Sequence, residues 1–291
     1  MRLLTFSYKG QALVGALRAD GSEELVEIPD VPDMLTLIES GPDGLNRARS
    51  ALAGGGARSH RLSEVRLLAP VPRPPGNVIA IGRNYKAHAE ESARAAGKEV
   101  DPPTVFTKAV TSVAGPYDDI VLDESVTTQV DWEVELGVVI GKSGRNISRE
   151  RALDHVFGFT AVNDVSARDI QFGWGGQYFK GKSVDGFCPL GPWIVTRDEI
   201  ADAQSLRLLL RLNGETKQDG NTSDMIYPVD AIIEWVSKGM TLLAGTVIAT
   251  GTPDGVGFAR TPPEFVKPGD VMEAEVEGIG TLRNRAVAVA G

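Results

Sequence analysis

The chain has 291 residues, of which 42% are hydrophobic and 24% are charged, a composition typical of a globular protein. Its formal net charge of -9 argues against a nucleic-acid partner, because phosphate binding needs basic patches and none is visible in the sequence. We also expect no membrane partner, since no stretch reaches the roughly 18 apolar residues that a spanning helix needs.

Turn-forming residues are abundant, with 33 glycines and 17 prolines, which indicates many tight turns between short strands. We therefore expect a mainly β fold of the α+β class. Cys188 is the only cysteine, so no disulfide can form within the chain, as is typical of a reducing compartment. Its neighbours Phe187 and Pro189 indicate a packed thiol and not a nucleophile. The start of the chain has no long apolar stretch, and we expect a cytoplasmic protein.

Residues 1–70 are predicted to form a small N-terminal α+β domain. Short strands are expected at 3–8, 12–17 and 25–28, followed by helices at 34–39 and 45–53. A proline-rich stretch at 70–76 is stiff and marks a boundary. The remainder, 71–291, is predicted to be the larger domain.

An apolar strand at 77–81 leads into the polar segment Lys86 to Lys98. His88 and Glu91 stand at positions i and i+3 of this segment, so they share one face if it is helical. The segment is flanked by Gly82 and Gly97 and could be a mobile lid. The alternative is that His88 is an ordinary surface histidine on a polar helix.

The strand expected at Val134 to Ile140 is preceded by acidic residues. Every second side chain of a strand points the same way, which places Asp131, Glu133 and Glu135 on one face. They form either a solvent-facing acidic edge or a partly buried group whose charge a cation or strong donors compensate.

A second hydrophobic strand, at 158–162, leads to Asp164. Its carboxylate is either a functional group at the strand end or the cap of the next turn. Together with Glu133 and Glu135 it describes an all-oxygen site, which suits Mg²⁺ or Mn²⁺ and not zinc.

Other elements are expected at 105–108 (strand), 148–155 (helix), 206–212 (strand of a hairpin turning at Asn213-Gly214), 229–238 (helix), and 246–249, 271–276 and 281–289 (strands).

Five spaced motifs together resemble the fumarylacetoacetate hydrolase family, in order and without a missing block from about residue 77 to 287. They are Gly82-Arg83-Asn84-Tyr85 with His88 and Glu91; Glu133-x-Glu135-x-Gly137; Asp164-x-x-x-Arg168-Asp169; Gly181-Lys182-Ser183; and Gly251-Thr252-Pro253-x-Gly255-Val256-Gly257. The stretch 172–179 is similar to an insert of the longer bacterial branch, which includes hydrolases of 2,4-diketo-3-deoxy sugar acids.

The resemblance implies a twisted, barrel-like β-sheet core, a homodimer, and a role for each site residue. Glu133, Glu135 and Asp164 would hold the metal, whereas Asp131 is not expected to be a ligand. His88 and Glu91 would form a water-activating dyad on a lid, and Lys182 would contact a substrate oxygen. The implied substrate-binding residues are Arg83, Tyr85, Arg168, Gln171, Gly251 and Thr252.

The activity implied is metal-dependent cleavage of the C–C bond of a 2,4-diketo acid, either an acylpyruvate or a 2,4-diketo-3-deoxy sugar acid, to pyruvate and a carboxylic acid. Related branches decarboxylate or tautomerise oxaloacetate, or isomerise 2-hydroxyhepta-2,4-diene-1,7-dioate, without needing an attacking water. An alternative of another class is a non-catalytic cation-binding assembly module. A lid with a base argues against it, because a purely structural metal needs no mobile base.

Overall fold

One long sheet runs through both predicted domains. The structure, a computed structural model, describes residues 1–19, 21–54, 56–96 and 104–289. The strands of this sheet lie in the order β4-β3-β2-β1-β15-β13-β11-β19-β6-β7. Their bounds are β1 (Arg2–Tyr8), β2 (Gln11–Leu17), β3 (Glu24–Glu27), β4 (Ser59–Arg61), β6 (Val78–Gly82), β7 (Thr104–Lys108), β11 (Val134–Ile140), β13 (Val156–Asn163), β15 (Cys188–Thr196) and β19 (Val247–Ala249), with β5 (Arg66–Leu67) paired to β1 and β8 (Val113–Ala114) to β15.

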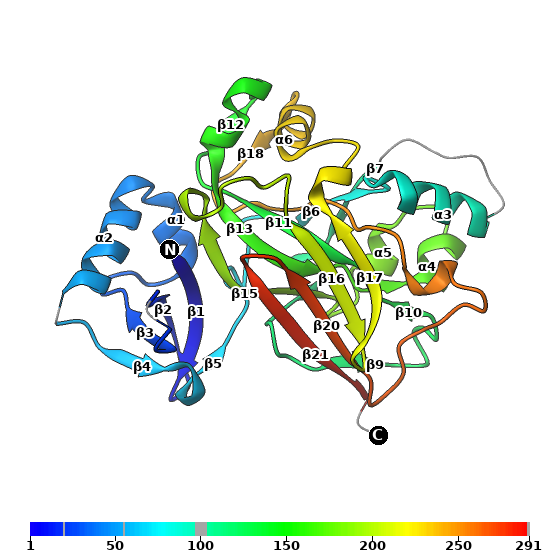
Figure 1. Ribbon diagram of the computed structural model, residues 1–291, viewed down its shortest axis with the longest axis horizontal. Helices are drawn as coiled ribbons and strands as arrows, with labels where there is room; N and C mark the ends of the chain where they lie inside the picture. Colours follow the sequence, from blue (N-terminus) through cyan, green and yellow to red (C-terminus); the bar gives the residue numbers. More distant parts are fainter. Residues whose placement is uncertain (20, 55, 97–103, 290–291) are drawn as a thin grey trace.

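The N-terminal strands and helices form as expected, at the left of Figure 1. A two-residue turn joins β1 to β2, and both of its residues have positive φ, 50° at Lys9 and 83° at Gly10, which suits a tight hairpin. Helix α1 (Met34–Glu39) is capped by Asp33, whose side chain accepts the Thr36 N–H. Helix α2 (Pro42–Ala53) begins three residues earlier than expected, since proline is favoured in the first helical turn.

The N-terminal strands continue the sheet of the rest of the chain. Strand β1 pairs with β15, Leu3 lying opposite Ile194. Hydrogen bonds between strands therefore join residues 1–70 to the rest of the chain, across the boundary that the sequence suggested. The division into domains at residue 70 stays a prediction.

A second sheet packs on the first. Its strand order is β17-β16-β20-β21-β9, with bounds β9 (Ile120–Leu122), β16 (Arg207–Leu212), β17 (Glu215–Asn221), β20 (Val271–Val276) and β21 (Gly280–Ala288). In Figure 1 this sheet lies against β11, β13 and β15, and its strands β16, β20 and β21 make contacts with them. Alternate residues of β20, namely Met272, Ala274 and Val276, point into the shared hydrophobic core.

The core is not a closed barrel. Among the described residues, both sheets are open, ending at β4 and β7 in the first and at β17 and β9 in the second. The mainly β, α+β class expected from the sequence is confirmed, and the barrel-like core takes the form of two open sheets packed face to face.

Helices gather at one end of these sheets, at the right of Figure 1. They are α3 (Lys86–Ala96), α4 (Arg168–Gly173) and α5 (Phe179–Lys182), whereas α6 (Val229–Ser237) lies elsewhere. Two-residue strands pair as β10 (Val130–Asp131) with β14 (Ser166–Ala167) and β12 (Gly144–Arg145) with β18 (Thr241–Leu242).

Several short helical turns are 3₁₀. They span Leu62–Glu64, Val110–Ser112, Arg149–His155, Arg197–Glu199, Thr222–Asp224 and Gly257–Ala259. The helix expected around 148–155 is therefore a 3₁₀ helix. No helix of the described residues is long and apolar enough to cross a membrane.

Candidate active site

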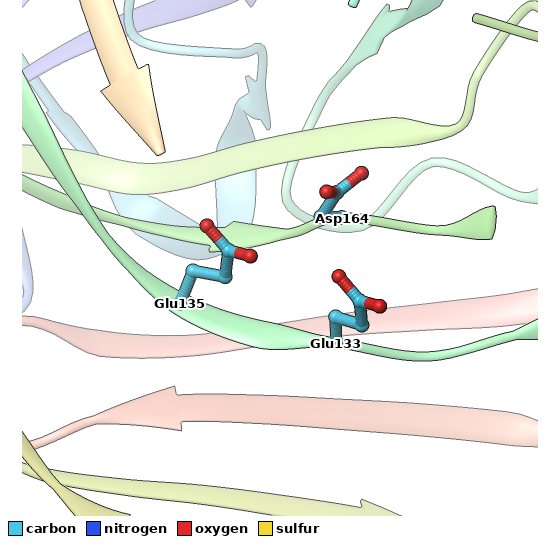
Figure 2. A group of neighbouring side chains, drawn as sticks. All are labelled: Glu133, Glu135 and Asp164. Carbon is cyan, nitrogen blue, oxygen red and sulfur yellow. The ribbon is translucent and has the colours of Figure 1, made fainter. Parts of the chain in front are cut away.

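Glu133, Glu135 and Asp164 come together at the end of two paired strands (Figure 2). Residues Val134 and Asn163 lie opposite each other in β11 and β13, so Asp164, which follows β13, lies beside Glu133. The Asp164 N–H donates to the Glu133 carbonyl oxygen at 2.8 Å. One carboxylate oxygen from each residue lies within 4.8 Å of the others, and the three residues are buried, with exposed fractions of 5%, 2% and 0%. The solvent-facing acidic edge is thereby excluded.

Asp131 lies outside this group, because the strand is interrupted between Asp131 and Val134. Its carboxylate accepts the backbone N–H groups of Gly257 at 2.7 Å and Phe258 at 3.0 Å, and the Arg168 Nε at 2.8 Å. Asp131 therefore links Arg168 to the backbone at Gly257 and Phe258 and is not a metal-ligand candidate, as expected.

Two basic side chains neutralise Glu133. Lys182 Nζ donates to Glu133 Oε2 and to Asp164 Oδ2, both at 2.8 Å, and Arg168 Nη2 donates to Glu133 Oε1 at 2.6 Å. Burial by itself raises the pKa of Glu133, but the charges of Lys182 and Arg168 outweigh it and hold that pKa below its usual value. Burial lowers the pKa of Lys182, but the charges of Asp164 and Glu133 raise it by more than burial lowers it. The net shift of this pKa is therefore upward, and the ammonium stays charged.

Glu135 differs from its neighbours. Its Oε2 accepts the Gly251 N–H at 2.8 Å, and no described side chain forms a salt bridge with it. Burial, followed by the charges of Asp164 and Glu133, raises its pKa well above the usual value. A buried carboxylate of this kind either binds a proton or is compensated by a cation. The all-oxygen donor set and this uncompensated charge fit a hard divalent ion such as Mg²⁺ or Mn²⁺.

Gly251 and Thr252 hold this end of β11. The φ of Gly251 is +100°, and a Cβ there would lie 2.8 Å from Asn84 Cβ, so only glycine fits. Thr252 Oγ1 donates to the Val134 carbonyl oxygen and accepts from Gln218 Nε2. These contacts position Glu135 and its strand, while a direct role of Gly251 and Thr252 in binding a substrate carboxylate stays a prediction.

A cavity of about 770 Å³ opens over Glu133 and Glu135. Of the residues expected from the sequence, those that line it are His88, Glu133, Glu135, Lys182, Arg83, Arg168, Gln171 and Thr252. Gln171 Oε1 accepts from Arg168 Nη1 at 2.9 Å, and Arg83 donates to the Tyr178 hydroxyl at 3.1 Å and to the Thr104 hydroxyl. Tyr85 is not among the lining residues, because its ring is buried in the core between the sheets.

His88 is a cavity residue and not a surface histidine. It lies in α3 with 7% of its side chain exposed, and its Nδ1 lies 3.6 Å from Glu91 Oε2, slightly beyond hydrogen-bond length. Glu91 is held by the Gly255 N–H, which lies 3.1 Å from its Oε2. The packing of α3 against the Gly257–Ala259 turn keeps this pair near the cavity. Residues 97–98 of the expected lid lie outside the described residues, and its mobility stays a prediction.

Sequence reasoning missed Lys108 and a set of aromatic side chains. Lys108 Nζ donates to Asp164 Oδ1 at 2.5 Å, and both side chains are completely buried. No local signal could have found it, because Lys108 ends a strand as a solvated lysine would and Asp164 lies 56 residues along the chain. The aromatic side chains that line the cavity are Phe106, Phe172, Tyr178 and Phe258.

Cys188 is buried, and burial raises the pKa of its thiol to about 12, so it is no nucleophile.

Comparisons with known proteins agree with this arrangement. The sequence model described as "Fumarylacetoacetate (FAA) hydrolase C-terminal" matches residues 77–287. Oxaloacetate tautomerase YisK of Bacillus subtilis is 49% identical over 233 residues, which are 79% of this chain and 76% of that protein.

Solved structures match over nearly the whole chain. A fumarylacetoacetate hydrolase from psychrophilic Exiguobacterium antarcticum has 41% identity and a TM-score of 0.85, covering 99% of both chains. Maleylpyruvate hydrolase from Sphingobium sp. SYK-6, solved with manganese(II) and pyruvate, has 30% identity and a TM-score of 0.80, again over 99% of both chains. The chain belongs to the fumarylacetoacetate hydrolase family.

Proposed function

We propose that this protein is a divalent-metal-dependent enzyme that interconverts the enol and keto forms of oxaloacetate. One observation carries the proposal: His88, next to Glu91, lines the same cavity as the buried carboxylates Glu133 and Glu135. A group that can exchange a proton thus lies beside a site that can hold a cation. The 49% identity to an oxaloacetate tautomerase supports this reaction in particular.

The metal would be held by Glu133, Glu135 and Asp164, whose oxygen donors suit Mg²⁺ and Mn²⁺ equally. When bound there, it would supply Lewis-acid polarisation of the C2 oxygen of a 2-oxo acid.

The chain's own residues would handle the proton. In tautomerisation the enol hydroxyl loses a proton and C3 gains one, so no co-reactant is needed. His88 is our candidate for the group that transfers the proton at C3, with Glu91 orienting its ring. Lys182 would offset negative charge on the C2 oxygen. Arg83, Arg168, Gln171 and Thr252, all cavity residues, are proposed to bind the carboxylates of the substrate.

A second candidate is hydrolysis of the C–C bond of a 2,4-diketo acid, the reaction that the sequence motifs favoured. The similarity to maleylpyruvate hydrolase supports it, and His88 could activate the attacking water. We rank it second because the relative named as a tautomerase has the higher identity. Decarboxylation of oxaloacetate and isomerisation of a 2-hydroxydienoate need the same enolate stabilisation and are further alternatives.

The deciding experiment supplies enol oxaloacetate to protein saturated with Mg²⁺ or Mn²⁺ and follows the loss of its ultraviolet absorbance, after subtraction of the protein-free rate. Pyruvate release from 2,4-dioxopentanoate is measured with the same preparation. Faster enol loss supports the tautomerase, and pyruvate release with no effect on oxaloacetate would shift the assignment to the hydrolase. No effect on either substrate would leave the isomerase and the non-catalytic cation-binding module.

We also propose a cytoplasmic homodimer. The lone, reduced Cys188 supports a reducing compartment, and the family resemblance supports the dimer. Sedimentation equilibrium tests the assembly, because a dimer has twice the mass of the 31.0 kDa chain.

A further inference from the structure

The cavity has two chemically different parts. Its inner part holds the carboxylates with Lys182 and Arg168, and its outer part is lined by four aromatic rings. The rings form a continuous wall: Phe106 to Tyr178 at 5.4 Å between centroids, Tyr178 to Phe172 at 6.4 Å, and Phe172 to Phe258 at 5.3 Å. We call Phe106, Tyr178, Phe172 and Phe258 the aromatic wall.

The wall begins where the charged part ends. The Arg168 guanidinium lies 4.5 Å from the centre of the Phe258 ring, and Lys182 Nζ lies 5.3 Å from that of Phe106. Each of these basic side chains also binds Glu133. A ligand whose acid group reaches the charged part therefore has its other end beside the rings.

The spacing between the two parts is fixed by the backbone. Helix α4 carries Arg168 at its start and Gln171 and Phe172 near its end, and Tyr178 directly precedes α5, which carries Lys182. Both helices are short, and they pack against each other, so the rings keep their position relative to the charged groups.

A small dicarboxylate does not account for this wall. A four-carbon acid fills only a small part of about 770 Å³. Phe172 is 51% exposed, so its ring is left largely open to solvent while it lines the cavity. An open, apolar surface inside a binding cavity is typical of a subsite that a ligand covers.

We propose that the aromatic wall is a subsite for a flat apolar substituent at the far end of a 2-oxo acid, so that the enzyme takes aryl-substituted 2-oxo acids in addition to oxaloacetate. This inference rests on the proposed function, since the charged part must first bind the 2-oxo acid group. The ring of the ligand would stack against or meet the edges of the wall residues.

The test is a binding measurement and needs no turnover. Dissociation constants of phenylpyruvate and pyruvate are measured by calorimetry with Mn²⁺-saturated protein. Covering a phenyl ring should make phenylpyruvate bind on the order of 10- to 100-fold more tightly than pyruvate. In the Phe172→Ala variant, the ratio of the pyruvate Kd to the phenylpyruvate Kd should fall about tenfold, while the Kd for pyruvate stays at the parent value. Phe172→Leu, which keeps apolar volume without the flat ring, should fall between the two.

Trp174 provides the matched control. It lies two residues beyond Phe172, is 63% exposed, and is not among the residues that line the cavity. Trp174→Ala should therefore keep the full preference for phenylpyruvate. A similar loss in Trp174→Ala, or equal Kd values for the two acids in the parent protein, would overturn the subsite.

The same preparations are assayed with oxaloacetate, which separates the two proposals. Acceleration of oxaloacetate tautomerisation without any preference for the aryl acid would overturn the subsite alone. A preference for the aryl acid without any action on oxaloacetate would overturn the tautomerase alone, and failure of the metal-saturated protein to bind either acid would overturn both.

Discussion

Lys108 Nζ donates to Asp164 Oδ1 at 2.5 Å, and neither side chain has any exposed surface. The same ammonium donates to the Val165 carbonyl oxygen at 3.1 Å. The other oxygen of Asp164 accepts from Lys182. Asp164 is thus held from two sides, and Lys108 compensates its charge without lining the cavity.

The first prediction concerns Lys108→Met, which removes a buried cation from a paired carboxylate. Breaking such a pair costs about 3–5 kcal/mol when the charge left behind is uncompensated, and the cost is smaller here because Lys182 still donates to Asp164. We expect the metal-free variant to melt several degrees below the parent. Because a bound divalent ion supplies the missing positive charge, Mn²⁺ should raise the Tm of the variant more than that of the parent. Thermal unfolding with and without Mn²⁺ measures both effects.

The control for this experiment is Lys217→Met. Lys217 is also buried, and it pairs with Glu215 and Glu264 at 3.0 and 2.9 Å, neither of which belongs to the group of metal-ligand candidates. This variant should lose stability while the increase in Tm on adding Mn²⁺ stays at the parent value. An equal metal response in the Lys108 and Lys217 variants would contradict the link between Lys108 and the metal site.

The second prediction is that activity requires a divalent cation and is abolished by Glu133→Gln or Asp164→Asn with the fold retained. Removing one charge weakens a site of three carboxylates sharply, since hard cations depend on ligand charge. Assays with and without chelator, together with circular dichroism, check this. Glu27→Gln is the control, because Glu27 pairs with His60 in the N-terminal part of the chain. Full activity in excess chelator would refute the prediction.

The third prediction concerns Gly251→Ala. The φ of +100° disfavours alanine, and its Cβ would also lie 2.8 Å from Asn84 Cβ and 2.9 Å from the Ile81 carbonyl oxygen. The backbone must shift, which moves the N–H that binds Glu135. We expect weaker Mn²⁺ binding by calorimetry in addition to lower stability.

Gly186→Ala isolates the backbone strain in that experiment. Gly186 has a φ of +81°, and no atom lies within 4 Å of its added Cβ. Left-handed backbone costs an alanine about 1–2 kcal/mol in either variant. Only Gly251→Ala should weaken metal binding, and the same Kd in the two variants would show that the Gly251 contact does not position Glu135.

The metal-ligand candidates could be predicted from local signals. Alternation along one strand placed Glu133 and Glu135 on one face, and the end of another strand marked Asp164. The same alternation failed for Asp131, because the strand breaks after it and its partner Arg168 lies 37 residues away. Local periodicity carries no information on such a distant contact.

Lys108 and the aromatic wall depend on tertiary structure. A lysine at a strand end has the sequence pattern of a solvated side chain, and only its contact with Asp164, 56 residues along the chain, shows that it is buried. Phe106, Phe172 and Phe258 come from three separate segments, and none is unusual in its own sequence context. The open sheets likewise follow from the pairing of distant strands, such as β1 with β15.

The fourth prediction concerns the reactivity of Cys188. Burial raises the pKa of its thiol from 9.0 to about 12, so the folded protein keeps a proton that the unfolded chain loses above about pH 9. Raising the pH from about 9 towards 12 therefore lowers the free energy of unfolding. At pH 8.5 the native protein should react with iodoacetamide far more slowly than the protein in urea, as followed by mass spectrometry. Equal rates would show that the thiol is accessible and activated.

The fifth prediction separates proton transfer from electron withdrawal within the candidate site. Removing a positioned acid or base slows proton transfer by on the order of 10²- to 10⁴-fold. We expect His88→Ala to lose oxaloacetate tautomerisation, and any hydrolysis of diketo acids, by that factor. Decarboxylation of oxaloacetate needs only an electron sink and should largely persist in His88→Ala, whereas Glu133→Gln should lose all of these reactions. Steady-state kcat/KM with saturating metal measures each.

Glu91→Gln tests whether Glu91 acts through His88. The carboxylate lies 3.6 Å from His88 Nδ1 and is held by the Gly255 N–H, an arrangement that can orient the imidazole without contacting the reacting atoms. Its loss should therefore resemble His88→Ala in a milder form, with a smaller fall in kcat and a changed pH profile for tautomerisation. The two changes should not add in the double variant, because removing the ring also removes the effect of orienting it. Additive losses would show that Glu91 acts independently, and near-parent tautomerisation by His88→Ala would show that His88 is not the proton-transfer group.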